Sequence, residues 1–176
     1  MDVLFIYGPA AAGKYTIGHR VGEILNMPLF HNHLVVDAVR ALFDFGTPGF
    51  CQLRAELWQS AFQTAAEHQQ SFVFTFSPER TVDPELISEL EQAITSQGGE
   101  VHYIELICND KHLIQRLNNE SRRRFGKLTD EALYQQIKAD GGFSFPRFCQ
   151  PVLSLDSGRL SAQQSALRII DWYRHR

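Results

Sequence analysis

Gly8-Pro9-Ala10-Ala11-Ala12-Gly13-Lys14-Tyr15-Thr16 is the stretch on which the interpretation of this chain depends. An apolar run, Val3–Tyr7, precedes it and predicts a strand, while a helical pattern begins near Gly13. The two glycines allow a tight turn whose backbone N–H groups point inward and make a nest for anionic oxygen. The start of the helix adds the positive end of its dipole at the same place. The sequence therefore predicts an anion-binding loop between a strand and a helix.

The spacing of the glycines and the lysine in this loop is that of a P-loop. Lys14 is expected to reach the β- and γ-phosphates of a nucleotide and to act in catalysis. The alternative is a chance glycine-rich turn before a helix, but the context, the spacing and the lysine agree with one another. The predicted nucleotide site comprises Gly8, Pro9, Ala10, Ala11, Ala12, Gly13, Lys14, Tyr15 and Thr16.

The residue after the lysine departs from the usual P-loop pattern. A Ser or Thr is expected there, with its hydroxyl on Mg²⁺, and this chain has Tyr15, whose phenol is too long for that role. Thr16 follows, rotated by about 100° along the helix, and is better placed for an α-phosphate contact. Thr16 is nevertheless the candidate hydroxyl for Mg²⁺.

Length and composition limit the class of protein. A chain of 176 residues suits one domain (1–176), with or without a small mobile flap. A net charge of −3 gives no reason to expect a nucleic-acid or membrane partner. Three widely spaced cysteines are typical of reduced thiols in a cytosol. No signal peptide and no run of about 20 apolar residues is present, so we expect a soluble cytoplasmic protein.

Short apolar runs alternate with helical patterns along the whole chain. This βα rhythm predicts an α/β fold with a parallel sheet. We expect strands at 2–7, 28–30, 71–76, 101–108 and 151–155. Helices are expected at 13–25, 34–42, 51–70, 84–97, 110–117 and 130–139, with a last one from 161.

Ligands of open parallel sheets bind beyond the carboxyl ends of the strands, so the loops that begin at His31, Ser77, Asn109 and Asp156 can surround the P-loop. The segment 116–127 is basic and contains Arg122, Arg123 and Arg124. Arginines on a mobile flap can clamp the oxygens of a phosphoryl group while they exclude water. The alternative is a solvated charge run on a helix.

His31-Asn32-His33 is a second candidate site. Two imidazoles two residues apart on an extended segment point the same way, but no third ligand stands at supporting spacing, so a pocket wall is favoured over a metal site. One histidine can serve as a base near neutral pH, and Asp37 is the nearest carboxylate that competes for this role. The predicted acceptor site comprises His31, His33, Asp37, Arg40 and Arg80, with Arg54 and Trp58 as weaker candidates.

The acidic residue usually found at the end of a strand beside a P-loop is missing. The third expected strand has Thr75 there, and Glu79 comes only in the following loop. Magnesium is then expected to be held mainly by phosphates and water.

These residues together resemble the small P-loop kinases of the shikimate kinase and nucleoside monophosphate kinase group. More narrowly, Gly-Pro-x-Ala-x-Gly-Lys-x-Thr with Phe30-His-Asn-His-Leu34 is similar to a family of shikimate-kinase-like bacterial ATPases. The resemblance covers nearly the whole chain. It implies a three-layer α/β/α fold, a five-stranded parallel sheet in the order 2-3-1-4-5, ATP with Mg²⁺, and transfer of the γ-phosphoryl group.

The resemblance also implies roles for particular residues. Gly8, Gly13, Lys14 and Thr16 would hold phosphates, Arg116 would lie against the adenine, and Arg123 or Arg124 would be the lid arginine. The lid would cover about 116–128, the substrate-binding helices about 33–70, and the loop after Asp156 would border the base.

The chain also departs from this group in two places. Shikimate kinases have two aspartates where His31 and His33 stand, and a Gly-Gly-Gly turn where Ser77-Pro78-Glu79 stands. Monophosphate kinases have an Asp-Gly-x-Pro-Arg turn that only Pro78 and Arg80 echo.

Three functional hypotheses follow. The first is a kinase for a small hydroxylated metabolite or nucleotide, acting as a monomer or homodimer. The second is a nucleotide-binding switch or slow ATPase without an acceptor, which Tyr15 and the missing carboxylate favour. The third is a metal protein that uses His31 and His33.

Overall fold

The structure of the protein is a computed structural model, which describes residues 1–117 and 128–176. Its strands are β1 (Asp2–Tyr7), β2 (Leu29–His31), β3 (Phe72–Phe76), β4 (Glu100–Ile107) and β5 (Leu153–Asp156). Its described helices are α1 (Lys14–Leu25), α2 (Asn32–Arg40), α3 (Pro48–Glu67), α4 (Pro84–Thr95), α5 (Asp110–Leu117), α7 (Glu131–Ala139) and α8 (Ala162–His175). The predicted lid arginines Arg122, Arg123 and Arg124 lie outside the described residues.

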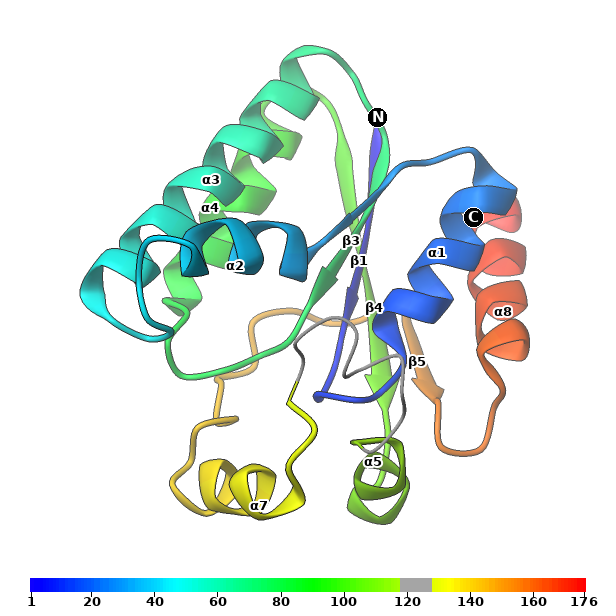
Figure 1. Ribbon diagram of the computed structural model, residues 1–176. Coiled ribbons are helices and arrows are strands. Elements are labelled where there is room, and N and C mark those ends of the chain that lie inside the picture. Colours follow the sequence, from blue (N-terminus) through cyan, green and yellow to red (C-terminus); the bar gives the residue numbers. More distant parts are fainter. Residues whose placement is uncertain (118–127) are drawn as a thin grey trace.

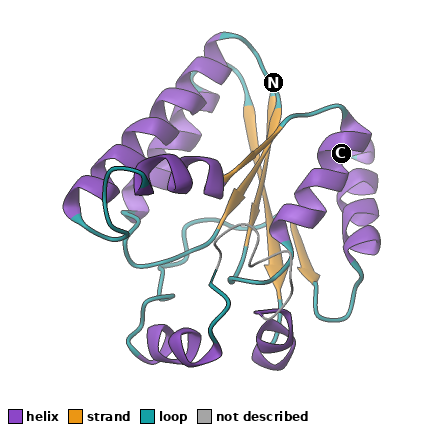
Figure 2. Ribbon diagram, in the orientation of Figure 1, coloured by secondary structure: helices purple, strands orange, loops and turns teal. Residues whose placement is uncertain are grey.

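The five strands form one parallel sheet in the order β2-β3-β1-β4-β5, which confirms the predicted α/β fold. The helices α3 and α4 cover one face of this sheet, and α1 and α8 cover the other (Figure 1). The colouring by secondary structure in Figure 2 shows the same three layers, with helices on both sides of the strands. All strands run in one direction, so their carboxyl ends meet at one edge of the sheet.

The central strand β1 supplies side chains to two separate cores. Phe5 and its neighbours at alternate positions, Val3 and Tyr7, pack toward α3 and α4. Leu4 and Ile6 pack toward α1 and α8. This alternation, with both faces buried, explains why β1 reads as an uninterrupted apolar run.

Both ends of the helix α3 differ from the bounds expected from the sequence, because a cap and a turn set them. The helix α3 begins at Pro48, three residues earlier than expected, because the Thr47 side chain accepts a hydrogen bond from the Phe50 N–H and proline suits the first turn. The chain leaves this helix at Glu67, also three residues earlier than expected. Gln69 there adopts a left-handed conformation (φ 52°) that a helix does not continue.

Within residues 1–117 and 128–176, no helix combines the length and the apolar character that crossing a bilayer requires.

The amino-terminal ends of β1 and β4 are joined to α8 by a polar cluster around Asp2. The Tyr173 hydroxyl donates to Asp2 Oδ2 (2.7 Å), and Arg176 Nη2 lies 2.7 Å from Asp2 Oδ1. His102 Nε2 also lies 3.1 Å from Asp2 Oδ1. Burial works to raise the pKa of Asp2, but the hydrogen bonds from Tyr173 and His102 and the charge of Arg176 outweigh it, so the pKa is lowered.

Phe74 tests the larger core. Its ring meets those of Phe5, Trp58 and Phe62 edge-on, with centroids 5.0, 5.7 and 5.1 Å away, and it has no exposed surface. Phe74→Ala should lower the free energy of unfolding by about 3–5 kcal/mol, measured by urea denaturation. The half-exposed Leu167, changed to Ala, is the control and should shift it by about 0.5 kcal/mol or less. A loss at Phe74 as small as at Leu167 would contradict this packing.

The lowered pKa of Asp2 predicts that the free energy of unfolding depends on pH. Its pKa is lower folded than unfolded, so its stabilising effect is complete above the ordinary value of 3.8 and is lost as the pH falls through the folded value. Asp2→Asn should therefore be destabilising at pH 7, and the difference from wild type should shrink below pH 3.8. Urea denaturation across pH 2.5–7 measures it, with Asp171→Asn, an exposed residue of α8, as the control. A difference that does not change with pH would contradict the assignment.

Candidate active site

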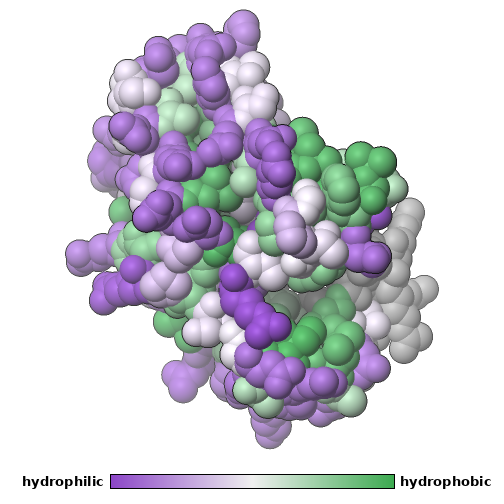
Figure 3. Space-filling model, turned by 90° about the vertical axis from the view of Figure 1, so that its left-hand side faces the viewer, coloured by the Kyte–Doolittle hydropathy of each residue, from purple (hydrophilic) through white to green (hydrophobic). Residues whose placement is uncertain are grey.

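A cavity of about 730 Å³ lies at the edge of the sheet where the strands end. Its described walls come from the segment 10–17, the start of α2 with Phe45, the end of β3 with the loop to Glu79, and the segments 128–143 and 157–162 with Arg116. On the face in Figure 3, the surface is hollowed between the upper body and a lower lobe whose wall is apolar. The cavity joins the P-loop to three of the five predicted acceptor residues, His31, His33 and Arg40.

The P-loop backbone makes a series of unusual turns. Gly8 has φ 150°, Ala11 φ 66° and Gly13 φ 94°. The two glycines were expected to allow such angles, but Ala11 also adopts a left-handed conformation that costs an alanine strain. The turn is closed by a hydrogen bond from the Ala12 N–H to the Pro9 carbonyl (3.2 Å).

Gly8 also lies too close to β4 for any side chain. A Cβ at this position would stand 2.4 Å from the carbonyl oxygen of Leu106, well inside van der Waals contact. Glycine is therefore required at the start of the loop for space as well as for conformation.

The start of α1 is electropositive. Gly13 is its N-cap, and within the described residues α1 has neither a side-chain cap nor an acidic residue in its first turn. Lys14 Nζ donates to the carbonyls of Gly8 (2.8 Å) and Pro9 (2.7 Å) and to Ser77 Oγ (2.9 Å). The ammonium is thus held over the loop, where the helix dipole also favours an anion.

Tyr15, at the position where a P-loop usually has a Ser or Thr, has a histidine ring as its neighbour. The Tyr15 ring meets the His31 ring edge-on at 5.0 Å, and the His31 and His33 rings are 6.4 Å apart. The Asn32 N–H donates to Thr75 Oγ1 (3.4 Å), which ties the start of α2 to β3. Tyr15, Thr16, His31 and His33 all line the cavity.

Arg116, the last basic residue of α5, lines the other end of the cavity. Its Nη2 donates to the Ser157 carbonyl (2.6 Å), and its Nη1 lies 3.8 Å from Cys108 Sγ. Burial raises the pKa of the Cys108 thiol, although the Arg116 charge works in the opposite direction. Arg116 is thereby held against the loop after β5, which also lines the cavity.

Glu79 lies in the cavity wall, which sequence reasoning missed. Glu79 does not count in the sequence as the acidic residue expected at the end of a strand, because it lies in the loop after β3. That loop lines the cavity through Ser77, Pro78 and Glu79. Glu79 is the one carboxylate among the described residues that line the cavity, whereas Lys14, Arg40 and Arg116 are cations there. This excess of positive charge suits a polyphosphate.

Two predicted acceptor residues lie elsewhere. Asp37 is exposed on α2, whose buried residues are Val35, Val36 and Val39, and it is not among the described residues that line the cavity. Arg80 is also exposed, and its Nη1 donates to the Asp140 carbonyl (3.2 Å). Arg40 does line the cavity, whereas Arg54 and Trp58 are buried in the core.

Among the described residues, His31 and His33 do not belong to a group of three side chains that could together hold a metal ion. In the part of the chain that the structure describes, the three side chains that could together hold an ion are Asp2, Glu100 and His102. They lie at the amino-terminal end of the sheet, and Arg176 binds the first two at 2.7 and 2.9 Å. The cluster therefore already contains a cation, and the third hypothesis has no support from the described residues.

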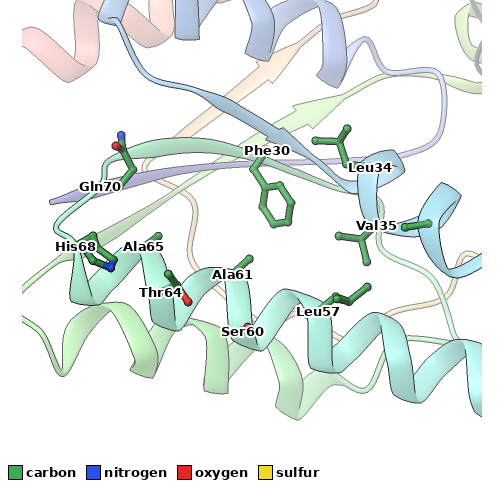
Figure 4. A pocket seen from close by; sticks show the side chains of 11 residues that line it. Phe30, Leu34, Val35, Leu57, Ser60, Ala61, Thr64, Ala65, His68 and Gln70 are labelled. Atoms are coloured by element: carbon green, nitrogen blue, oxygen red, sulfur yellow. The ribbon is translucent and has the colours of Figure 1, made fainter.

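A second cavity of about 700 Å³ lies between α2 and α3, where Phe30 of β2 points toward Ala61 of α3 (Figure 4). Its described walls carry His68 as their single titratable side chain and are mostly apolar. Its described lining contains no Lys, Arg, Asp or Glu, so the first cavity is the better candidate for a phosphate site.

Solved structures share this architecture over nearly the whole chain. A sugar kinase from Janibacter sp. HTCC2649 is 15% identical with a TM-score of 0.68, covering 99% of this chain and 95% of that chain. The APS kinase of Mycobacterium tuberculosis, in complex with AMPPNP and APS, is 16% identical with a TM-score of 0.66, covering 98% and 97%. The shikimate kinase of Aquifex aeolicus is 12% identical with a TM-score of 0.59, covering 99% and 96%.

This chain has the fold of the shikimate-kinase-like P-loop kinases. At these identities the likeness establishes the fold alone. No protein-family model and no curated protein matches the chain.

The close approach at Gly8 gives a test of the loop. Gly8→Ala must move either the loop or β4, because its Cβ would meet Leu106 O at 2.4 Å, and should weaken ATP binding about tenfold or more. Isothermal titration with ATP measures the affinity. Gly98→Ala is the control, because Gly98 also has a positive φ (75°) but no atom within 4 Å of its added Cβ. Equal ATP affinity in the two variants would argue against the P-loop as the nucleotide site.

Proposed function

We propose that the protein is an ATP-dependent phosphotransferase that moves the γ-phosphoryl group of ATP to a hydroxyl of a small molecule. One observation carries the proposal: a single cavity joins the P-loop with its lysine to a wall of polar side chains from α2. The fold is shared with kinases of several small molecules, which supports the same chemistry here.

The nucleotide end of the cavity fits polyphosphate. Its loop backbone can approach an anion closely, α1 begins there without an acidic residue, and Lys14 stands above the loop. Arg116 would lie against the base, held by the Ser157 carbonyl, with Leu160 as an apolar neighbour in the cavity wall. These residues would bind and orient ATP.

The acceptor end is lined by His31, His33 and Arg40 from β2 and α2. Their donors suit a hydroxylated molecule. Arg40 makes no hydrogen bond or ion pair with any described residue, so its guanidinium is available to a ligand.

Thr16 is the residue that would contact Mg²⁺, since Tyr15 packs against His31. The remaining ligands would be phosphate oxygens and water, as this ion permits. Mg²⁺ supplies charge neutralisation at the β- and γ-phosphates when it is bound.

In the proposed reaction the P-loop residues stabilise charge rather than form bonds. Lys14 and the loop N–H groups would donate to the phosphate oxygens on which charge develops. The walls of 128–143 would exclude water from the transferred group. The expectation that Arg123 or Arg124 binds the oxygens of the transferred phosphoryl group stays a prediction from the sequence.

A nucleotide-binding switch or slow ATPase is the second candidate. Tyr15 favours it, because a phenol stands at the sequence position of the usual Mg²⁺ hydroxyl and its ring contacts the His31 ring. The two candidates differ in whether an acceptor raises ATP consumption.

The test measures ATP consumption in the presence of a library of hydroxylated metabolites and nucleoside monophosphates. At least one compound should raise turnover well above the background with water and be recovered phosphorylated. Lys14→Ala should lower this turnover about 10²–10³-fold, because an ammonium at the developing charge is lost. Lys111→Ala, an exposed lysine of α5 outside the cavity wall, is the matched control and should retain full turnover.

If ATP binds but no compound stimulates turnover, the switch or slow-ATPase function replaces the kinase. If wild type and Lys14→Ala bind ATP equally poorly, both candidates fail.

A further inference from the structure

Arg54 is a cation buried in the core of the α3 side. Only 1% of its surface is exposed, and its guanidinium carbon lies 5.1 Å from the Phe50 ring centre and 5.2 Å from that of Trp58. Burying a guanidinium in such surroundings is costly unless its donors are paired. The hydrogen-bond partners of Arg54 therefore indicate what this buried side chain does in the structure.

The groups held by Arg54 belong to the loop after β3. Its Nη1 donates to Glu79 Oε1 (2.7 Å) and to Thr81 Oγ1 (3.1 Å), and its Nη2 donates to the Thr81 carbonyl (2.6 Å). The helix α3 thus fixes a loop that is distant from it in sequence. This loop forms the cavity wall next to the P-loop.

Glu79 is the residue of this loop that combines a fixed position with an available acceptor. Its Oε1 accepts hydrogen bonds from both Arg54 and Thr81 (2.7 Å each). Its Oε2 makes no hydrogen bond with any described residue, and 16% of the side chain is exposed. One carboxylate oxygen therefore anchors the side chain and the other is left for a ligand.

The electrostatics of the pair favour a hydroxyl as that ligand. Arg54 neutralises the charge of Glu79 at 2.7 Å, so the pair attracts a cationic amine only weakly. It still offers a strong, oriented hydrogen-bond acceptor. Ser77, two residues before Glu79, accepts a hydrogen bond from Lys14 Nζ (2.9 Å), which brings the same loop to the phosphate end of the cavity.

We propose that Glu79 binds the acceptor's hydroxyl and takes its proton, and that Arg54 is the positioning residue for Glu79. The proposal rests on the proposed phosphotransferase function. In this step the hydroxyl oxygen forms a bond to the γ-phosphorus, and the bond from that phosphorus to the β,γ-bridging oxygen breaks. The electron pair of the broken bond stays on ADP, and the proton passes to Glu79 and then to solvent.

Asp37 and the two histidines are the other candidates for this step among the described residues. Asp37 does not line the cavity, and Glu79 is the one carboxylate among the described residues that do. His31 and His33 are the remaining side chains of the acceptor end that can take a proton, and they come from β2 and α2 rather than from the loop bound to Lys14.

The experiment is a double-mutant cycle with Glu79→Gln, Arg54→Lys and the combined variant. Glutamine keeps an oxygen for Arg54 and removes the proton acceptor, and lysine keeps the buried charge while it loses the fork of donors. Glu56→Gln, an exposed hydrogen-bonded glutamate on α3, is the matched control. We measure kcat/KM for the stimulating acceptor against pH, ATP affinity by titration, and urea unfolding.

Glu79→Gln should lower kcat/KM about 10²–10⁴-fold, as expected when a positioned base is removed. Its ATP affinity should stay within about threefold of wild type, and Glu56→Gln should match wild type in every measurement. Arg54→Lys should lower kcat/KM in the wild-type background and should have little further effect in Glu79→Gln, because it acts through that carboxylate.

A purely structural ion pair would give a different result. Glu79→Gln would then keep kcat/KM within about threefold, or the effects of the two variants would multiply, and either outcome overturns the proposal. If no acceptor stimulates wild type, the kinase function has failed. The same variants are then compared for basal ATP hydrolysis, where water takes the place of the hydroxyl, and an unchanged rate in Glu79→Gln overturns the role of Glu79.

Discussion

The contact between Gly8 and β4 is the constraint on which the rest of the site depends. The loop can start where it does only because no side chain stands between Gly8 and the Leu106 carbonyl. This close approach sends the chain over the end of the sheet, and the left-handed residues Ala11 and Gly13 then turn it into α1. Because β1 is the central strand of a parallel sheet, the strands on both sides of it end at the same edge as the P-loop. The start of α2 and the loops that follow β3 and β5 therefore surround the P-loop.

Most of the fold could be predicted from the sequence because its signals are local. The apolar run of β1 and the glycines after it fix a strand, a loop and a helix without reference to distant residues. The strand order followed from the resemblance to a known group, and the structure confirms it. The bounds of α3 were wrong by three residues at each end, since they depend on the Thr47 cap and on the backbone angle at Gln69.

The acceptor end was harder to predict, because its members come together through tertiary contacts. Arg54 looked like a residue that flanks the pocket, and only the packing of α3 reveals that it is buried and holds Glu79. Asp37 was favoured for its nearness in sequence to His33, yet the turn of α2 directs it to solvent. The spacing of apolar residues alone does not say which side of a short helix is buried. In the structure the buried side of α2 is the one that carries Val35, Val36 and Val39.

The hydrogen bonds of Lys14 have a consequence for how the two ends of the cavity are linked. An ammonium has three N–H donors, and the oxygens of Gly8, Pro9 and Ser77 lie at 2.8, 2.7 and 2.9 Å from it. A phosphate that reaches Lys14 must replace one of them, and Ser77 is the one outside the P-loop. Its release frees the amino-terminal side of the loop that carries Glu79, while Arg54 keeps the other side in place. Under the proposed function, nucleotide binding would therefore loosen the Ser77 side of this loop while Glu79 stays fixed by Arg54, which links the two ends of the cavity.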